Sequence, residues 1–587
     1  MAARRSSDVP HPLIPRRELD FLLHDWLRIG DLPAVAEHGR ETVDAILDLS
    51  EQVAAEHFLP HYKEADAREP RLDSDGVHIL PAIGAALREY AALGLFSAGF
   101  APELGGLGLP YIVCSASFAQ FAAANIATAA YPMLTVANAR LIATFGTAAQ
   151  IDSFARPQIA GRWFGTMCLS EPQAGSGLAD VRTRAERDGE DGCGVRYRLT
   201  GNKMWISGGD QDVSENIVHL VLAKVPRPDG ALPEGTEGLS LFIVPKIMPD
   251  GARNDVQVAG LNHKMGYRGT VNCLLNLGEA GGAIGWMVGE LGQGLRQMFL
   301  MMNEARIGVG IGAAALAYRG YRHSVAYARE RLQGRRFGVR AGPPVAIAEH
   351  PDVQRMLLAQ KAFAEGALAL CLYCALLVDR HDDPPSTALL GLLTPVAKTW
   401  PSEWGLAAND LAIQVHGGYG YTRDFDVEQL YRDNRLNPIH EGTTGIQAVD
   451  LLGRKLLRDS AGWAELRRRV GATVAAARDD KALASFAVTL ADVWEHVAMR
   501  LERLRAVKEP AEAFDNATPF LSAFGHAVIA WLWLELALVQ AEDQTLTAAK
   551  QRTCRYFFGH EVPKIAAWLA PVDIPDVGSD VPAATFD

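Results

Sequence analysis

The chain has 587 residues, of which 49% are hydrophobic, 21% charged and 8% aromatic, and its formal net charge is −12. This length predicts two to four domains, and the composition is that of an ordinary soluble globular protein rather than a disordered or fibrous one. The negative balance argues against nucleic acid or an anionic membrane as the main partner, because both attract clustered positive charge.

The first part of the chain is predicted to be helical. Its first ten residues are basic but lack the apolar core of a secretory signal, so we expect a short disordered tail there. From about Leu19 to Phe154 the apolar residues recur at helical spacing, and the main interruption, Ala101–Pro110, carries the glycines and prolines of a loop. Residues 1–160 are therefore assigned to an N-terminal helical domain.

The pattern then changes to short β-rich runs separated by Gly, Pro and Asp, between about Gly161 and Leu277. The clearest runs are Met204–Ser207, Ile217–Ala223, Leu239–Val244 and Val271–Leu275. Such runs predict a compact sheet or barrel of antiparallel strands, which we assign to residues 161–280.

Helical spacing returns after the β-rich part and predicts a helical bundle at 281–460 and an additional helical domain with a polar tail at 461–587. The sequence Gly308-Val-Gly-Ile-Gly312 resembles a nucleotide-binding glycine loop, but it follows a helical run rather than a strand, so we expect close helix packing there. The apolar run Ala527–Leu534 is too short to span a bilayer and predicts a buried helix, with no membrane span. The predicted class is α+β, mainly α.

Seven cysteines are scattered along the chain, and their odd number gives no disulfide framework, which fits a reducing cytoplasm. Cys371 and Cys374 form a CxxC pair inside an apolar run, with no second pair or histidine at zinc spacing. We interpret them as core thiols and predict no metal site.

Glu441 is the candidate catalytic base. It stands between the apolar pair Pro438-Ile439 and a Gly-Thr-Thr-Gly turn. A carboxylate beside apolar neighbours is expected to bind a proton more readily than an exposed one. Taken alone, however, a glutamate before Gly-Thr is more often a turn or helix-cap residue than a base.

Several other segments of the sequence support a catalytic role for this glutamate. The four most specific are Cys168–Ser176, Lys203–Gly209, Gln414–Tyr421 and His440–Thr443, and weaker ones are Gly105–Gly108, His263–Gly269 and Val288–Gly294. In order and spacing they resemble the signatures of the flavin-dependent acyl-CoA dehydrogenases, over about Leu19 to Leu457. The extra C-terminal helical part is similar to the long branch of that family, which includes 3-methylmercaptopropionyl-CoA dehydrogenases.

The resemblance implies a four-part architecture: an N-terminal helical domain, a β-barrel-like middle domain, a helical bundle and the additional C-terminal helical domain. It implies FAD as the cofactor and the α,β-dehydrogenation of an acyl-CoA thioester. Glu441 would take the α-proton and flavin N5 the β-hydride, giving a trans-2-enoyl-CoA. Candidate substrates are 3-methylmercaptopropionyl-CoA and short- or medium-chain acyl-CoAs, in fatty acid β-oxidation.

The implied binding residues fall into two sets. The cofactor set is Leu169, Ser170, Ser176, Trp205, Ser207, Arg331, Gln414, Gly417, Gly418 and Thr443. The substrate set is Ser176, Arg306 and Gly442. On the strand, Trp205 and Ser207 alternate with Met204 and Ile206, so both are expected to face the same side.

The family pattern also implies partners. Arg331 and the Gln414–Gly418 turn would reach the FAD of a neighbouring subunit, in a homodimer or a tetramer, and an electron-transferring flavoprotein would accept the electrons. Three departures lie at the cofactor periphery, where Gly177, Gly334 and Gly445 replace an aspartate, an aromatic residue and a glutamine of many relatives.

Two alternative functions stay open. Acyl-CoA oxidases and flavin monooxygenases share this fold but let oxygen reach the reduced flavin. Alkylation-response relatives bind DNA through a C-terminal helical domain, but residues 461–587 carry a net charge of about −4, whereas a DNA-binding face is expected to be basic.

Overall fold

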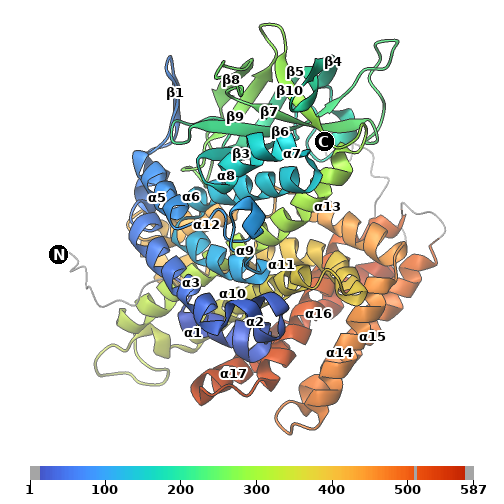
Figure 1. Ribbon diagram of the computed structural model, residues 1–587. Coiled ribbons are helices and arrows are strands. Elements are labelled where there is room, and N and C mark those ends of the chain that lie inside the picture. Colours follow the sequence, from blue (N-terminus) through green and yellow to red (C-terminus); the bar gives the residue numbers. More distant parts are fainter. Residues whose placement is uncertain (1–12, 508–511, 575–587) are drawn as a thin grey trace, which may run out of the picture. The chain divides into compact units, whose positions relative to one another are not determined.

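The structure, a computed structural model, describes residues 13–507 and 512–574 (Figure 1). The tail predicted at residues 1–10 and most of the C-terminal polar tail lie outside this part of the chain. The protein divides into two compact units, which are described separately. The sheet unit comprises residues 41–308, and the helical unit comprises residues 309–587 together with the first 40 residues.

The sheet unit begins with helices, as the spacing of apolar residues predicts. Its longest helix, α6, has 35 residues with a kink at Asn125, and most of its side chains are buried. A small hairpin of two three-residue strands interrupts the helical part, which the sequence analysis did not predict. The non-sheet elements are α3 (Arg40–Val53), η3 (Ala54–Phe58), α4 (Tyr62–Ala67), β1 (Arg71–Asp73), β2 (Gly76–His78), α5 (Pro81–Ala92), η4 (Pro102–Leu104), α6 (Tyr111–Phe145), α7 (Ala148–Gln150), η5 (Ile151–Ala155), α8 (Arg156–Ile159) and η6 (Leu178–Asp180).

Eight strands form one sheet, drawn in cyan to green in Figure 1. They are β3 (Trp163–Cys168), β4 (Arg184–Asp191), β5 (Gly194–Ser207), β6 (Asn216–Lys224), β7 (Leu239–Pro245), β8 (Val256–Leu261), β9 (Asn272–Leu277) and β10 (Ala283–Val288). The sheet closes on itself because β10 pairs with both β7 and β5, which confirms the barrel-like prediction. The expectation of antiparallel strands throughout was wrong, since β3 and β4 each pair with β6 in parallel.

The helical unit contains the predicted bundle and the additional helices. α10 and α11 pack side by side, and Asp383 caps the start of α11 by accepting a hydrogen bond from the Ser386 N–H at 3.1 Å. The elements are α1 (Arg16–Asp20), η1 (Phe21–Trp26), η2 (Ile29–Asp31), α2 (Pro33–His38), η7 (Ile347–Glu349), α10 (Pro351–Asp379), α11 (Pro384–His416), η8 (Gly417–Tyr421), α12 (Val427–Asn434), α13 (Thr444–Val449), η9 (Asp450–Leu457), α14 (Ala461–Arg478), α15 (Ala484–Arg505), η10 (Glu512–Phe514), α16 (Ala517–Leu538), α17 (Gln544–His560), α18 (Lys564–Leu569) and η11 (Ala570–Asp573). Helix α9 (Gly294–Glu330) begins in the sheet unit and ends in the helical unit.

Two predictions about the helical unit are confirmed. Cys371 and Cys374 are fully buried on α10 as core thiols, and burial raises the pKa of Cys374. At Gly310 an added Cβ would lie only 2.1 Å from the Ala397 carbonyl oxygen, so this glycine permits close packing of α9 against α11. The glycine run therefore serves helix packing.

Four described helices, α6, α9, α10 and α16, are long and apolar enough to cross a membrane by length and composition alone. In each, 81% to 89% of the residues in the most apolar window are buried inside the protein. Packing against other parts of the chain therefore accounts for their apolar character. The run Ala527–Leu534 lies in α16 and is fully buried, as predicted.

A buried charge cluster joins the two ends of the chain within the helical unit. Lys550 on α17 donates hydrogen bonds to Glu18 on α1 and, at 2.9 Å, to Glu365 on α10. Lys361 also pairs with Glu365. The side chains of Lys550, Glu18 and Glu365 are at most 3% exposed. Burial, followed by the charge of Glu365, raises the pKa of Glu18.

Candidate active site

The predicted flavin segment begins where β3 ends at Cys168. Leu169 and Ser170 are half-buried, and Glu171 and Ala174 then exchange two backbone hydrogen bonds of 2.9 and 3.0 Å that close a tight turn. Beyond this turn Ser176 is exposed. The segment is therefore a strand end followed by an exposed glycine turn, as the sequence predicts.

A buried ion pair lies directly behind this strand end. Lys203, on β5, is fully buried and donates to the Glu171 carboxylate at 2.9 Å. It also donates to the backbone carbonyls of Leu169 at 3.0 Å and Leu222 at 2.8 Å. Both residues stand inside the motif segments, but no role was predicted for either. A lysine within a strand that carries apolar residues was the available signal.

Trp205 occupies a β-bulge. The pairing of β5 with β9 shifts register between Lys203 and Ile206, and Trp205 has a left-handed φ of +65°. Strict alternation along this strand is therefore wrong, since Lys203 and Ile206, three positions apart, are both buried. The Trp205 side chain is 58% exposed, which is unusual for so large a ring, and a strained, exposed residue of this kind is typical of a binding surface.

Two further predicted residues lie in the sheet unit. Ser207 accepts a hydrogen bond from the Asn272 amide at 3.2 Å and is half-buried. Arg306 is 3% exposed, within α9. Arg306 is therefore not a helix-surface residue, and its burial is compatible with the predicted substrate role.

Glu441 lies in the helical unit, in the bend before α13. It is half-buried and has a left-handed φ of +54°, while Gly442 has φ +90°. The Gln447 side chain donates to the Glu441 carbonyl at 3.0 Å, and a Cβ on Gly442 would lie 2.6 Å from the same amide nitrogen. Thr443 caps α13 by accepting from the Ile446 N–H at 3.4 Å. The backbone around the candidate base is therefore tightly defined.

The residue before Glu441 is a neutral histidine. Burial, reinforced by the positive charge of Lys398, lowers the pKa of His440 to about 3. Its Nε2 lies 3.0 Å from the Asn437 side-chain oxygen, which in this tautomer accepts a hydrogen bond from the ring. His440 therefore orients the segment without adding a charge beside Glu441.

The residues predicted to reach a neighbouring subunit lie together on the helical unit. Arg331 follows α9, and its guanidinium carbon lies 6.0 Å from the ring centroid of Tyr419 in the Gly417–Tyr421 turn. Gln414, Gly417 and Gly418 are exposed. Gly334 has φ +70° and lies against His350, which gives a backbone reason for glycine where many relatives carry an aromatic residue.

The predicted site thus consists of two groups. Leu169, Ser170, Ser176, Trp205, Ser207 and Arg306 belong to the sheet unit, and Arg331, Gln414, Gly417, Gly418, Glu441, Gly442 and Thr443 belong to the helical unit. Within each unit the structure places them on defined turns, strand ends and helix ends. Their assignment as one active site stays a prediction.

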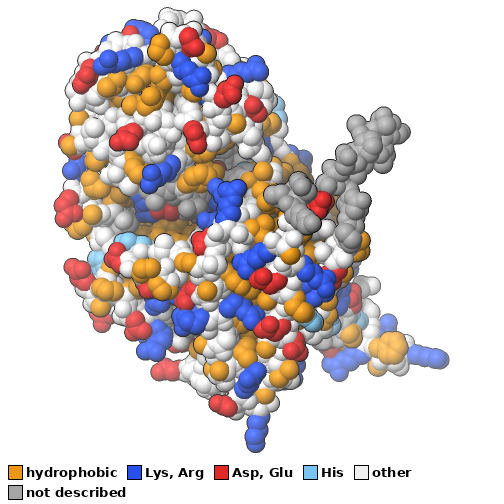
Figure 2. Space-filling model, turned by 90° about the vertical axis from the view of Figure 1, so that its right-hand side faces the viewer, with side chains coloured by type: hydrophobic (Ala, Val, Ile, Leu, Met, Phe, Trp, Pro, Cys, Tyr) orange, Lys and Arg blue, Asp and Glu red, His pale blue; other side chains and the backbone are white. Residues whose placement is uncertain are grey.

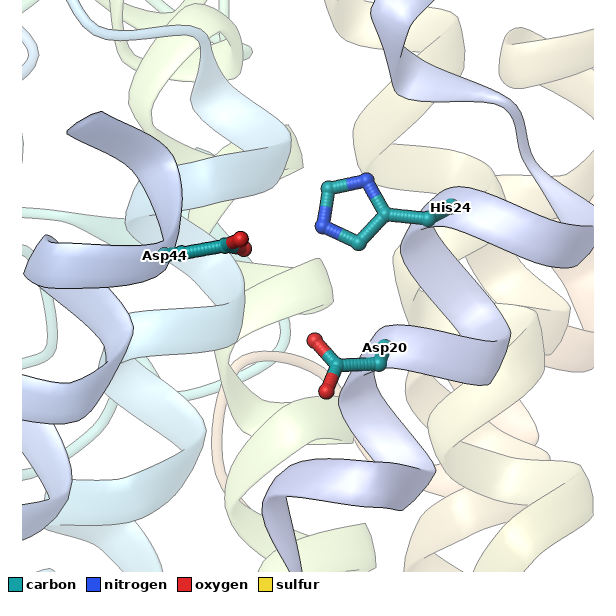
Figure 3. Close-up of side chains that lie close together, drawn as sticks. All are labelled: Asp20, His24 and Asp44. Carbon is teal, nitrogen blue, oxygen red and sulfur yellow. The ribbon is translucent and has the colours of Figure 1, made fainter. Parts of the chain in front are cut away.

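Asp20 and His24, which Figure 3 shows on adjacent turns of the same helical segment, are four residues apart in the helical unit. Asp20 accepts a hydrogen bond from Arg16 at 2.9 Å. Two side chains are fewer than the four ligands of a typical zinc site, and Asp44, also drawn there, belongs to the sheet unit.

Family models match nearly the whole chain. The N-terminal domain of acyl-CoA dehydrogenases matches residues 40–162, their middle domain 166–279 and their C-terminal domain 292–457. A further model, described as acetyl-CoA dehydrogenase C-terminal like, matches residues 466–577.

Individual proteins that are similar to this chain point to the same family. The 3-methylmercaptopropionyl-CoA dehydrogenase of Ruegeria pomeroyi is 35% identical over 92% of this chain and 95% of its own length. The broad-specificity linear acyl-CoA dehydrogenase FadE5 of Mycobacterium tuberculosis is 33% identical over 85% of this chain and 84% of its own length. A solved FAD complex of an acyl-CoA dehydrogenase from Bacillus anthracis shares the fold, with a TM-score of 0.76 at 22% identity, covering 95% of this chain and 92% of that one.

Proposed function

The chain belongs to the acyl-CoA dehydrogenase family of FAD-dependent oxidoreductases, and we propose that Glu441 is the base that takes the α-proton of its acyl-CoA substrate. The observation that carries this role is the backbone of Glu441, which is held at φ +54° by the Gln447 amide on its carbonyl. This backbone conformation fixes the direction of the Cα–Cβ bond from which the carboxylate extends. This geometry suits a general base, which must lie within hydrogen-bond reach of the proton it removes.

The residues present fit FAD. Trp205 offers an exposed ring face beside the Leu169–Ser170 strand end, and Ser170 presents backbone groups there. The turn at Gly417 and Gly418 has open space around both glycines, and Arg331 supplies an exposed guanidinium that suits a pyrophosphate. When bound, FAD supplies the acceptor for the β-hydrogen, which leaves as hydride. Thr443, Ser176, Gly442 and Arg306 would complete the cofactor and substrate contacts.

We propose a linear acyl chain of short or medium length, including 3-methylmercaptopropionyl-CoA, as the substrate. Two relatives that match most of this chain support this choice, since one is named for that thioester and the other for linear acyl-CoAs. An electron-transferring flavoprotein is the proposed electron acceptor, and oxygen is the competing one.

A substrate ladder tests both choices. Purified yellow protein is mixed under argon with linear acyl-CoAs of increasing length and with 3-methylmercaptopropionyl-CoA, and bleaching of the flavin band is followed. We expect bleaching with linear thioesters, then reoxidation by an electron-transferring flavoprotein. If none of the thioesters bleached the flavin, the proposed substrate class would be wrong. Rapid reoxidation in air with stoichiometric peroxide would instead identify an oxidase.

We further propose a homodimer, or a tetramer built from it, in which Arg331 completes the FAD site of the neighbouring subunit. The segment that follows Arg331 supports this, because large apolar side chains are exposed on it between arginines. Leu332, Phe337 and Val339 are exposed there together with Arg335, Arg336 and Arg340, and Tyr419 and Tyr421 are exposed in η8. Exposed aromatic and apolar side chains together with arginine are typical of protein interfaces.

Subunit mixing tests the shared site. Arg331→Ala and Glu441→Gln subunits are each expected to be inactive as homodimers. Co-expression is expected to restore activity, because one site of each heterodimer would combine an intact Glu441 with an intact Arg331 from its neighbour. Random pairing gives about a quarter of the wild-type number of sites. Heterodimers that show no activity would mean that both residues serve the same subunit.

We also propose that the enzyme is cytoplasmic and does not bind nucleic acid. The seven cysteines form no disulfide with one another in the structure, which is consistent with a reducing compartment. In the C-terminal helices many cations are already paired, including Arg467 with Glu495 and Arg500 with Asp573. Figure 2 shows Lys, Arg, Asp and Glu side chains interspersed on one face of the molecule, without a broad area of positive charge. Retention of duplex DNA by the full chain would contradict this part of the proposal.

A further inference from the structure

The Lys203–Glu171 ion pair holds more than its own two side chains. Lys203 reaches the carbonyl of Leu169, on the strand end that is proposed to line the flavin, and the carbonyl of Leu222 on β6. The next residue along β5, Met204, donates its backbone N–H to the Ser170 carbonyl at 3.0 Å. The strand end and the start of the Trp205 bulge are therefore joined by two adjacent residues of β5.

Glu171 fixes the other end of the same loop. Its carboxylate accepts hydrogen bonds from the backbone N–H groups of Arg182, at 2.7 Å, and Thr183, at 3.0 Å, and also from the Thr183 hydroxyl. The Gln173 amide donates to it at 2.7 Å. One buried carboxylate thus closes the loop 171–183, which carries Ser176, and ties it to Lys203.

Burial lowers the pKa of Lys203, and the charge of Glu171 opposes that shift. Burial by itself would raise the pKa of Glu171, but the charge of Lys203 and the hydrogen bonds from Thr183 and Arg182 outweigh it, so the pKa of Glu171 is lowered. The carboxylate therefore stays ionised at neutral pH. A buried ion pair of this kind contributes little to the stability of the fold, because the cost of desolvating both charges offsets their attraction. Removing one of the two partners is nevertheless costly, because the other charge is then buried without compensation.

The ammonium also acts on the peptide group that it contacts. Its hydrogen bond to the Leu169 carbonyl polarises the Leu169–Ser170 peptide, which makes the Ser170 N–H a stronger donor. Within the described residues, that N–H has no hydrogen-bond partner. A polarised donor on a half-buried strand end is suited to a ligand acceptor.

We propose that Lys203 and Glu171 are positioning residues, whose buried ion pair locks the Leu169–Ser170 strand end, the 171–183 loop and the Trp205 bulge into one prebuilt surface for the flavin. This inference rests on the proposed placement of FAD at that surface. It explains why a fully buried lysine stands next to a strained tryptophan. In a preorganised site the conformational entropy of these segments is lost during folding, so it does not reduce the affinity for FAD.

Two variants and one control test the inference. Lys203→Met removes the ammonium, and Glu171→Gln removes the carboxylate charge at nearly constant size. The control is Asp188→Asn, which makes the same change as Glu171→Gln in a carboxylate that pairs with Arg196 and Arg198 near the opposite end of β5. Each apoprotein is titrated with FAD at a temperature where circular dichroism shows it to be folded.

Both variants are expected to bind FAD at least about tenfold more weakly than the wild type and to shift the visible flavin band, while Asp188→Asn keeps the wild-type dissociation constant and spectrum. A purely structural pair would change melting temperatures alone. If Lys203→Met fails to fold, Glu171→Gln decides the question. Unchanged FAD affinity and spectrum in a folded Glu171→Gln protein would overturn the inference, whereas a wild-type protein that binds no FAD would overturn the cofactor assignment itself.

Discussion

Replacing Glu441 with glutamine is expected to leave a yellow, folded protein. Its bound flavin should no longer be bleached by an acyl-CoA substrate at a useful rate. Glutamine has nearly the same size but cannot take a proton, and a general base contributes about 10²- to 10⁴-fold to such a step. The Gln447 hydrogen bond goes to the backbone carbonyl of residue 441, so it does not depend on the side chain that is changed. The loss should therefore be one of chemistry and not of structure.

Anaerobic stopped-flow measurement of the flavin band checks this result, with FAD content and melting temperature measured on the same samples. The matched control is Glu403→Gln, because the Glu403 carboxylate accepts a hydrogen bond from Thr444 in the adjoining turn without being the proposed base. The control should still be bleached. Undiminished bleaching of Glu441→Gln, or equal loss in both variants, would show that a different group removes the proton.

Lys550→Met is expected to lower the free energy of unfolding by about 3 to 5 kcal/mol. The substitution removes the cation that Glu18 and Glu365 share in a fully buried setting, and leaves Glu18 without its hydrogen-bonded cation. The Lys550 ammonium also lies 4.9 Å from the ring centroid of Phe21 and 6.0 Å from that of Trp533, so the substitution removes these cation–π contacts together with the ion pairs. Urea unfolding monitored by circular dichroism measures it.

The pH dependence of this variant gives a second readout. Without Lys550 the pKa of Glu18, already raised in the folded state, should rise further, so the folded variant holds a proton that unfolded glutamate loses above about pH 4.3. The folded state then binds more protons than the unfolded chain, and stability falls as pH increases. The deficit relative to wild type should be larger at pH 8 than at pH 5. Lys564→Met should cost less, because Lys564 itself is half-exposed although its partner Glu561 is buried.

Motif-bearing turns and the order of the domains were predictable from the sequence, because glycine-rich turns and helical periodicity are local signals. The runs at Ile217–Ala223 and Leu239–Val244 are strands β6 and β7, and the glycine turn after Cys168 has the expected form. Strands β4, β8 and β10 were not predicted, because β4 is mostly polar and exposed, β8 is interrupted by Ala259-Gly260, and β10 lies beyond the predicted boundary at residue 280.

Features that depend on distant contacts were not predictable. The bulge at Trp205 arises where β5 changes register against β9, which no residue spacing encodes. The burial of Lys203 depends on acceptors contributed by Leu169, Glu171 and Leu222, from three places in the chain. The pairing of Glu18 with Lys550 spans 532 positions and has no local signature at either end.

The contact between Glu18 and Lys550 can form only after almost the whole chain has been synthesised. Residues 41–308 form one continuous unit and can close soon after they emerge, whereas the segment around Glu18 must wait for Lys550 before its carboxylate meets its cation. At a synthesis rate of about 5 to 20 residues per second this delay is roughly half a minute to two minutes. During that interval the Glu18 carboxylate lacks the cation with which it pairs in the folded protein.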